Sequence, residues 1–163
     1  MMASQDPACE DLRKRISGIV FLGTPHRGSD YASYLKNLLR MSPAHSTRHY
    51  ISSLEKSSSA LAKVNDTFRH HADQLLLYSF FETKPITFGL GNSAFIVTKE
   101  SAVLGYPKER VCLLNGDHRS ICKFSSPSDP NYISLTEAFA SMNKELAVKR
   151  MRLSSIHELP TMY

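Results

Sequence analysis

The clearest indication of the fold comes from residues 18–29, GIVFLGTPHRGS. Its first five residues, Gly18–Leu22, form a continuous apolar run that includes β-branched side chains, and Gly23-Thr24-Pro25 ends that run. An apolar run of this length, without alternating polar residues, is typical of a strand that is buried on both faces. Strands of this kind occur in parallel sheets. The polar residues that follow, at 24–29, would then lie at the carboxyl end of this strand.

The rest of the chain alternates predicted strands with predicted helices. Further apolar runs predict strands at Leu75–Phe81 and Val111–Asn115, with a short additional strand at Ala94–Thr98. Capping residues and helical spacing predict four helices, at Asp6–Arg15, Asp30–Arg40, Ile51–Gln74 and Ser134–Arg150. Strands separated by helices predict the α/β class with a largely parallel sheet. Residues 151–163 lack periodicity and contain Pro160, so we expect them to form a loose tail.

Composition is that of a globular domain. The 163 residues are 42% hydrophobic and 21% charged, which suits one domain with a real core. No segment approaches the roughly 18 apolar residues that a membrane span needs, and the first residues do not resemble a signal peptide. The three scattered cysteines, Cys9, Cys112 and Cys122, argue against a disulfide framework and for a reducing compartment. We therefore expect an intracellular protein, most simply a cytoplasmic one.

The net charge of +5 is spread along the chain. Its densest patches are residues 13–15 and the segment Lys144–Arg152. Neither patch is interleaved with aromatic residues, as a surface that stacks nucleic-acid bases would be. These patches are expected to be solvated helix faces, and we predict no nucleic-acid partner.

Polar clusters follow the predicted strands at their carboxyl ends, where α/β sheets place their chemistry. Glu82 follows the second strand, and Asp117-His118 follows the last one. An acid that precedes a histidine is the order found in serine hydrolases of this architecture. The acid would fix the histidine tautomer, and the histidine would take the proton of a nucleophile. The alternatives are an ordinary capping carboxylate for Glu82 and, for His118, a loop histidine bonded to Asp117 or to backbone.

A nucleophile, a metal site and a cofactor site are all missing from the sequence pattern. The chain contains no G-x-S-x-G motif; residues 91–95, GNSAF, lack the second glycine and follow Glu82, which is the wrong order. Ser29 suits a helix cap, and no cysteine pairs convincingly with His118. His45 and His49 have helical spacing but no third ligand. Residues 23–28 form no phosphate cradle, because Pro25 removes an amide donor. We predict no metal and no cofactor.

Four motifs resemble a lipase-like α/β-hydrolase family. That family includes the serine-active-site-containing proteins, which are relatives of the inositol deacylases, and the hydrolase-like domains fused to NACHT-type NTPases in filamentous fungi. The motifs occur in the family's order between about residues 6 and 135, at 18–29, 79–85, 101–106 and 117–124. The resemblance implies that Glu82 is the triad acid and His118 the triad base. The family's serine elbow normally precedes the G-T-P-H-R-G loop.

The resemblance leads to an expected fold and function. We expect residues 1–150 to form an incomplete α/β-hydrolase-like domain that lacks the N-terminal strands and the nucleophile elbow, followed by the tail at 151–163. Such a domain would be inactive alone and would act on an ester or lipid substrate if an upstream segment completed it. The alternative is a non-enzymatic module of a NACHT-type signalling protein that binds a protein partner through an exposed sheet edge. A third interpretation is that the protein associates peripherally with the endoplasmic reticulum or mitochondrial membrane through the basic segment Lys144–Arg152.

Overall fold

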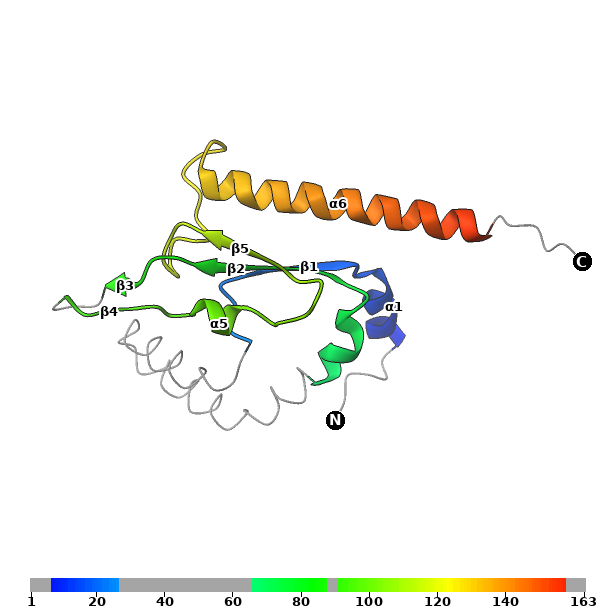
Figure 1. Cartoon of the computed structure of the whole chain (residues 1–163), viewed down its shortest axis with the longest axis horizontal. Helices are drawn as coiled ribbons and strands as arrows, with labels where there is room; N and C mark the ends of the chain where they lie inside the picture. The colour runs from blue at the N-terminus through cyan, green and yellow to red at the C-terminus, as the bar shows by residue number, and fades with distance from the viewer. Residues whose placement is uncertain (1–6, 27–65, 88–90, 158–163) are drawn as a thin grey trace, which may run out of the picture.

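The computed structural model describes residues 7–26, 66–87 and 91–157 of the chain. Within these residues, helices and strands are arranged around one parallel sheet (Figure 1). The elements, in chain order, are α1 (Pro7–Arg15), β1 (Gly18–Leu22), β2 (Leu76–Glu82), β3 (Ile86–Thr87), β4 (Ser93–Ala94), α5 (Lys99–Ala102), β5 (Arg110–Leu114) and α6 (Pro130–His157).

The main sheet is parallel and has the strand order β1-β2-β5. The predicted α/β class is therefore confirmed, and each of the three main predicted strands lies within one residue of the observed bounds. β2 is the central strand, and residues 77–80 within it are buried. Because all three strands run in the same direction, their carboxyl ends at Leu22, Glu82 and Leu114 lie at the same edge of the sheet.

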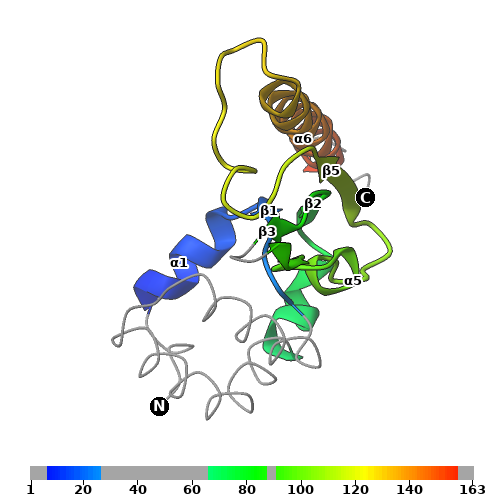
Figure 2. The ribbon, with the colours of Figure 1, turned by 90° about the vertical axis from the view of Figure 1, so that its left-hand side faces the viewer.

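The long helix α6 covers one face of this sheet (Figures 1 and 2). The core between helix and sheet includes buried Tyr78, Phe80 and Leu114 from the strands, and Ala138 and Met142 from the helix. Side chains alternate along a strand, so Tyr78 and Phe80 point to the same face of β2. Burial of these large side chains is the main favourable contribution to docking α6.

Polar contacts also attach α6 to the sheet. Arg110, the first residue of β5, forms an ion pair with Glu145 and donates a hydrogen bond to the hydroxyl of Ser141 at 2.8 Å. At the start of the helix, the Asp129 carboxylate accepts a hydrogen bond from the Asn131 amide at 2.9 Å. The Asp129 side chain therefore satisfies one of the amides that the first turn leaves without a helical acceptor.

The predicted bounds of α6, Ser134–Arg150, are too short at both ends. At the amino end, Pro130 stands at the first helical position, where its missing amide hydrogen costs nothing. At the carboxyl end, no glycine or proline occurs before Pro160, so the helix continues to His157. Residues 151–157, which we expected in a loose tail, are therefore helical.

The opposite face of the sheet carries the short helix α5 and a helical segment at residues 66–72 (Figure 2). The second segment is the described part of the helix predicted at Ile51–Gln74. The predicted helix Asp30–Arg40 lies outside the described residues. A second, smaller core forms near α5, where buried Ile86, Ile96, Val97 and Ala102 pack with Phe81.

The predicted short strand at Ala94–Thr98 is largely wrong. Only Ser93 and Ala94 form a strand there, and they pair with Ile86 and Thr87 in the antiparallel ladder β3-β4. Beyond Ala94, the buried amides of Ile96 and Val97 donate to the Glu82 carboxylate. A side-chain acceptor thus replaces a neighbouring strand at these two positions.

Among the helices that the structure describes, none combines the length and the apolar character that crossing a bilayer would require.

The packing of α6 predicts that alanine substitutions at two residues of this helix change the free energy of unfolding by unequal amounts. Met142 is 7% exposed in the core, whereas Phe139 is 46% exposed. Met142→Ala should lower the free energy of unfolding by about 2–5 kcal/mol, because it leaves a cavity beneath the helix. Phe139→Ala should change it by only about 0.5 kcal/mol. Urea denaturation of the two variants measures the difference, and equal losses would mean that α6 does not dock as described.

Candidate active site

Glu82 is the last residue of the central strand β2, and its side chain is 0% exposed. Its Oε1 atom accepts two hydrogen bonds, from the amide of Ile96 at 2.7 Å and from the amide of Val97 at 2.8 Å. A buried carboxylate is costly unless hydrogen bonds replace the lost water. The two amides supply those bonds and hold the carboxylate in one orientation.

His118 lies in the loop that follows β5. Its Nδ1 atom is 3.2 Å from Oε2 of Glu82, and its side chain is 21% exposed. The two carboxylate oxygens therefore have different partners, since Oε1 faces the backbone amides and Oε2 faces the imidazole. The two residues singled out from the sequence are thus neighbours at the carboxyl end of the sheet; their catalytic role stays a prediction.

Backbone contacts hold the two strand ends together. Glu82 and Leu114 are paired in the β2-β5 ladder. Immediately after them, the amides of Thr83 and Lys84 both donate to the carbonyl of Gly116 at 3.1 Å. The Thr83 hydroxyl adds a bond to the Leu114 carbonyl at 3.1 Å. These bonds fix the point from which the His118 loop begins.

Asp117 shapes the loop that carries His118. Its Oδ1 atom accepts hydrogen bonds from the amides of Arg119 and Ser120 at 3.0 and 2.9 Å, and from the Ser120 hydroxyl at 2.8 Å. Burial acts to raise the pKa of the Asp117 carboxyl, but these hydrogen bonds and the charge of Arg119 outweigh it, and the pKa is lowered. Asp117 is therefore a charged acceptor that closes a tight turn around the histidine.

The loop after β1 forms a third side of this site. Gly23 has a φ of 56°, and its amide donates to the Phe80 carbonyl at 2.8 Å. A Cβ atom at Gly23 would lie 2.7 Å from Cδ1 of Ile121 and 3.4 Å from Nδ1 of His118. Only glycine allows both this backbone conformation and this close approach. The predicted polar cluster 24–29 is described only as far as His26.

His26 belongs to a second set of polar contacts, which the sequence pattern did not indicate. Its amide donates to the Ser101 carbonyl at 2.8 Å, and its ring packs edge-on against Phe21 at 4.5 Å. Burial lowers the pKa of His26, and the nearby Glu109 carboxylate opposes that shift. The Glu109 carboxylate itself accepts bonds from the backbone amide of Leu104 at 2.9 Å and from that of Gly105 at 2.6 Å. These contacts connect the β1 loop to the segment before β5.

Three candidate nucleophiles in the described part of the chain have other partners or a disfavoured reactive form. Ser93 of the GNSAF segment shares a hydrogen bond with the Thr87 hydroxyl, and the Ser120 hydroxyl donates a hydrogen bond to Asp117. Burial raises the pKa of the Cys112 thiol, although Arg110 partly opposes this, so the reactive thiolate is disfavoured. Ser29, His45 and His49 lie outside the described residues. Within the described ranges, no group of three or more His, Cys, Asp or Glu residues is placed to hold a metal ion.

A cavity of about 320 Å³ adjoins the buried acid. Apolar rings provide part of its wall, since Phe81 and Phe95 both line it. The ammonium group of Lys99 lies 5.3 Å from the centre of the Phe81 ring, within range of a cation–π interaction. The remaining lining residues are Glu82, Thr83, Thr98 and Glu100. The site therefore combines a fixed acid–histidine pair with a small cavity that has an aromatic wall.

A comparison of the chain with protein-family models, curated proteins and solved structures finds no match. The resemblance of the four sequence motifs to the lipase-like family therefore stays a prediction.

The geometry predicts that the carboxylate of Glu82 supports the fold more than the His118 ring does. Glu82→Leu leaves two buried amides without an acceptor, so we expect a loss of about 2–6 kcal/mol in the free energy of unfolding. Glu82→Gln keeps one acceptor oxygen and should lose less. His118→Ala leaves both amides bonded and should lose the least. Urea denaturation ranks the three variants; a Leu variant as stable as the Ala variant would contradict this role of the carboxylate.

Proposed function

We propose that the chain is an incomplete α/β-hydrolase-like domain of the lipase or esterase type. It contributes the acid Glu82 and the base His118, lacks the serine nucleophile and is inactive alone. The observation that carries this proposal is the 3.2 Å contact between the His118 imidazole and a fully buried carboxylate that two amides hold in place. An ion pair on the protein surface would remain hydrated, so its carboxylate would not need the two amide hydrogen bonds.

The chemistry follows from which imidazole atom faces the acid. Nδ1 of His118 faces Glu82, so we assign proton transfer with the nucleophile to Nε2, the other ring nitrogen. In a completed site, Nε2 would take the proton of the serine hydroxyl as the oxygen attacks the ester carbonyl. It would then give that proton to the departing alcohol. Glu82 would fix the tautomer and stabilise the imidazolium.

The proposed substrate is an ester with an apolar portion, such as a lipid. The cavity beside Glu82 supports this choice, because Phe81 and Phe95 offer apolar surface next to the acid. The 163 residues contain no G-x-S-x-G motif, so the serine would come from another polypeptide segment. We propose an intracellular location, most simply cytoplasmic; Cys112 and Cys122 are both free thiols, as expected in a reducing compartment.

The alternative is a protein-binding module of a NACHT-type signalling protein. The observation that favours it is the position of β1, which is an edge strand among the described residues. Its five residues are only half-buried, and the neighbouring Ile16 is 43% exposed. A partner strand that paired with β1 would cover this edge.

The test is to supply the missing nucleophile. A segment that carries a G-x-S-x-G elbow and its preceding strands, taken from an active α/β-hydrolase, is fused ahead of Pro7. We expect the fusion to hydrolyse short acyl esters and His118→Ala to slow that reaction by about 10²- to 10⁴-fold. The matched control is His70→Ala, which removes an exposed histidine from the helical segment 66–72 and should leave the rate unchanged.

Two outcomes separate the proposals. Equal turnover by the fusion and its His118→Ala variant would exclude His118 as the base. A fusion that folds and stays inactive in both forms would favour the protein-binding alternative.

A further inference from the structure

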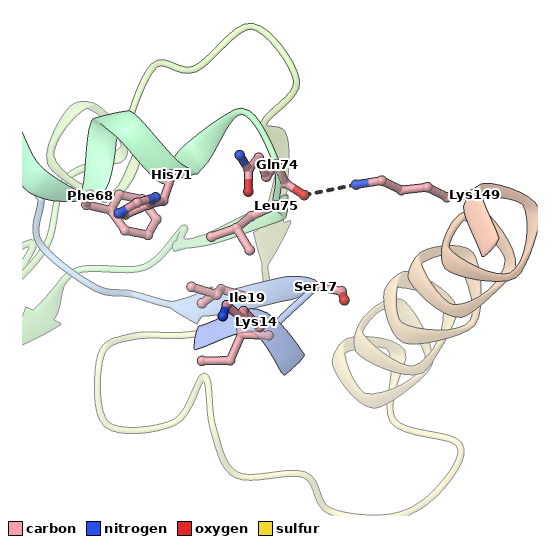
Figure 3. Close-up of a pocket in the computed structure, with 9 residues that line it drawn as sticks. Lys14, Ser17, Ile19, Phe68, His71, Gln74, Leu75 and Lys149 are labelled. Atoms are coloured by element: carbon pink, nitrogen blue, oxygen red, sulfur yellow. Dashed lines mark hydrogen bonds between the residues drawn. The ribbon is translucent and has the colours of Figure 1, made fainter. Parts of the chain in front are cut away.

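We propose that the cavity at the amino end of the sheet binds a medium-chain fatty carboxylate. This cavity has a volume of about 460 Å³, within the range of about 300–1,000 Å³ that small-molecule sites occupy. It lies among α1, the helical segment 66–72, the start of β1 and α6 (Figure 3). Its lining residues are Lys14, Ile16, Ser17, Ile19, Phe68, His71, Gln74, Leu75 and Lys149.

This cavity is separate from the acid–histidine pair. Ser17 and Leu75 immediately precede β1 and β2, whereas Glu82 is the last residue of β2. Seven residues of extended chain, Leu76–Glu82, therefore separate the two ends of the sheet. Binding at the cavity does not require the proposed hydrolase chemistry and can be measured independently of it.

Part of the cavity wall consists of apolar side chains that remain accessible to solvent. Ile16, Ile19, Phe68 and Leu75 contribute hydrocarbon surface, and none of them is fully buried. Figure 3 shows Ile19 and Leu75 on facing sides of the cavity, with Phe68 farther along the helical segment. Covering this surface with an acyl chain would remove it from water, which is favourable in proportion to the area covered.

Two ammonium groups supply the complementary charge. Lys14 comes from α1 and Lys149 from α6, and none of the lining residues in the described part of the chain is acidic. Lys149 donates to the Gln74 carbonyl at 3.2 Å, which directs its side chain from α6 toward the residues that follow the helical segment 66–72 (Figure 3). Lys14 pairs with Glu10 at 3.2 Å, but both side chains are more than half exposed, so this pair is weak. Each ammonium has three N–H donors, so each keeps donors for a ligand.

The charge count favours a single carboxylate. Among the described residues, the two lining lysines and Glu10, the ion-pair partner of Lys14, sum to one positive charge. A monoanion matches that charge, whereas a polyanion such as a nucleotide phosphate would not be neutralised. An apolar wall combined with one excess positive charge therefore suits a molecule with one carboxylate and one acyl chain.

Decanoate is the probe for this proposal. Isothermal titration calorimetry with the full chain should detect binding of decanoate and weaker binding of the neutral analogue 1-decanol. Lys149→Gln should weaken decanoate binding by about tenfold, as the loss of one charge-assisted hydrogen bond would. Lys144→Gln is the matched control, because Lys144 is an exposed lysine on the same helix that does not line the cavity. It should bind decanoate like the wild type.

The location of the ligand is tested separately by amide chemical shifts. Decanoate should move the amide signals of Ser17 and Gln74 and leave those of Ile96 and Val97, which contact Glu82, in place. Shifts confined to Ile96 and Val97 would place the carboxylate at the candidate active site and overturn the proposal. No detectable binding, or equal binding by wild type and Lys149→Gln, would also overturn it. Circular dichroism checks that both lysine variants are folded.

Discussion

The carboxylate of Glu82 is buried at the end of the central strand, where it contacts two backbone amides and the His118 imidazole. A carboxylate with no exposed surface at the end of a central strand is stable only if hydrogen bonds and an opposite charge or donor replace its water. Ile96 and Val97 give it two backbone amides on one oxygen, and His118 faces the other oxygen. The carboxylate therefore contacts both the loop that follows β4 and the loop that carries His118.

The sequence predicted the sheet well because its strands are apolar on both faces. Gly18–Leu22 is a strand with the bounds that its apolar run predicts, and the other two main strands are shifted by one residue at most. The proximity of Glu82 and His118 also followed from the sequence, since parallel strands bring their carboxyl ends to one edge. The positions of both residues at the carboxyl ends of predicted parallel strands were therefore enough to predict that they lie close together.

Other features could not be predicted, for physical reasons that differ from case to case. The donors to Glu82 are backbone amides, which every residue except proline carries, so Ile96 and Val97 looked like strand residues. The contacts of His26 with Ser101 and Glu109 join segments that are far apart along the chain. The extension of α6 to His157 was missed because a helix end is predicted from a glycine or proline, and neither occurs in α6 after Arg150.

We expect Glu82 to hold His118 in one tautomer, with the proton on Nδ1. Proton and nitrogen-15 spectra of the His118 imidazole test this expectation. The wild-type chain should show a downfield, slowly exchanging Nδ1 proton, which is lost in Glu82→Gln while the Ile96 and Val97 amide signals persist. An imidazole that carries its proton on Nε2, with the same spectrum in wild type and Glu82→Gln, would mean that Glu82 does not set the tautomer.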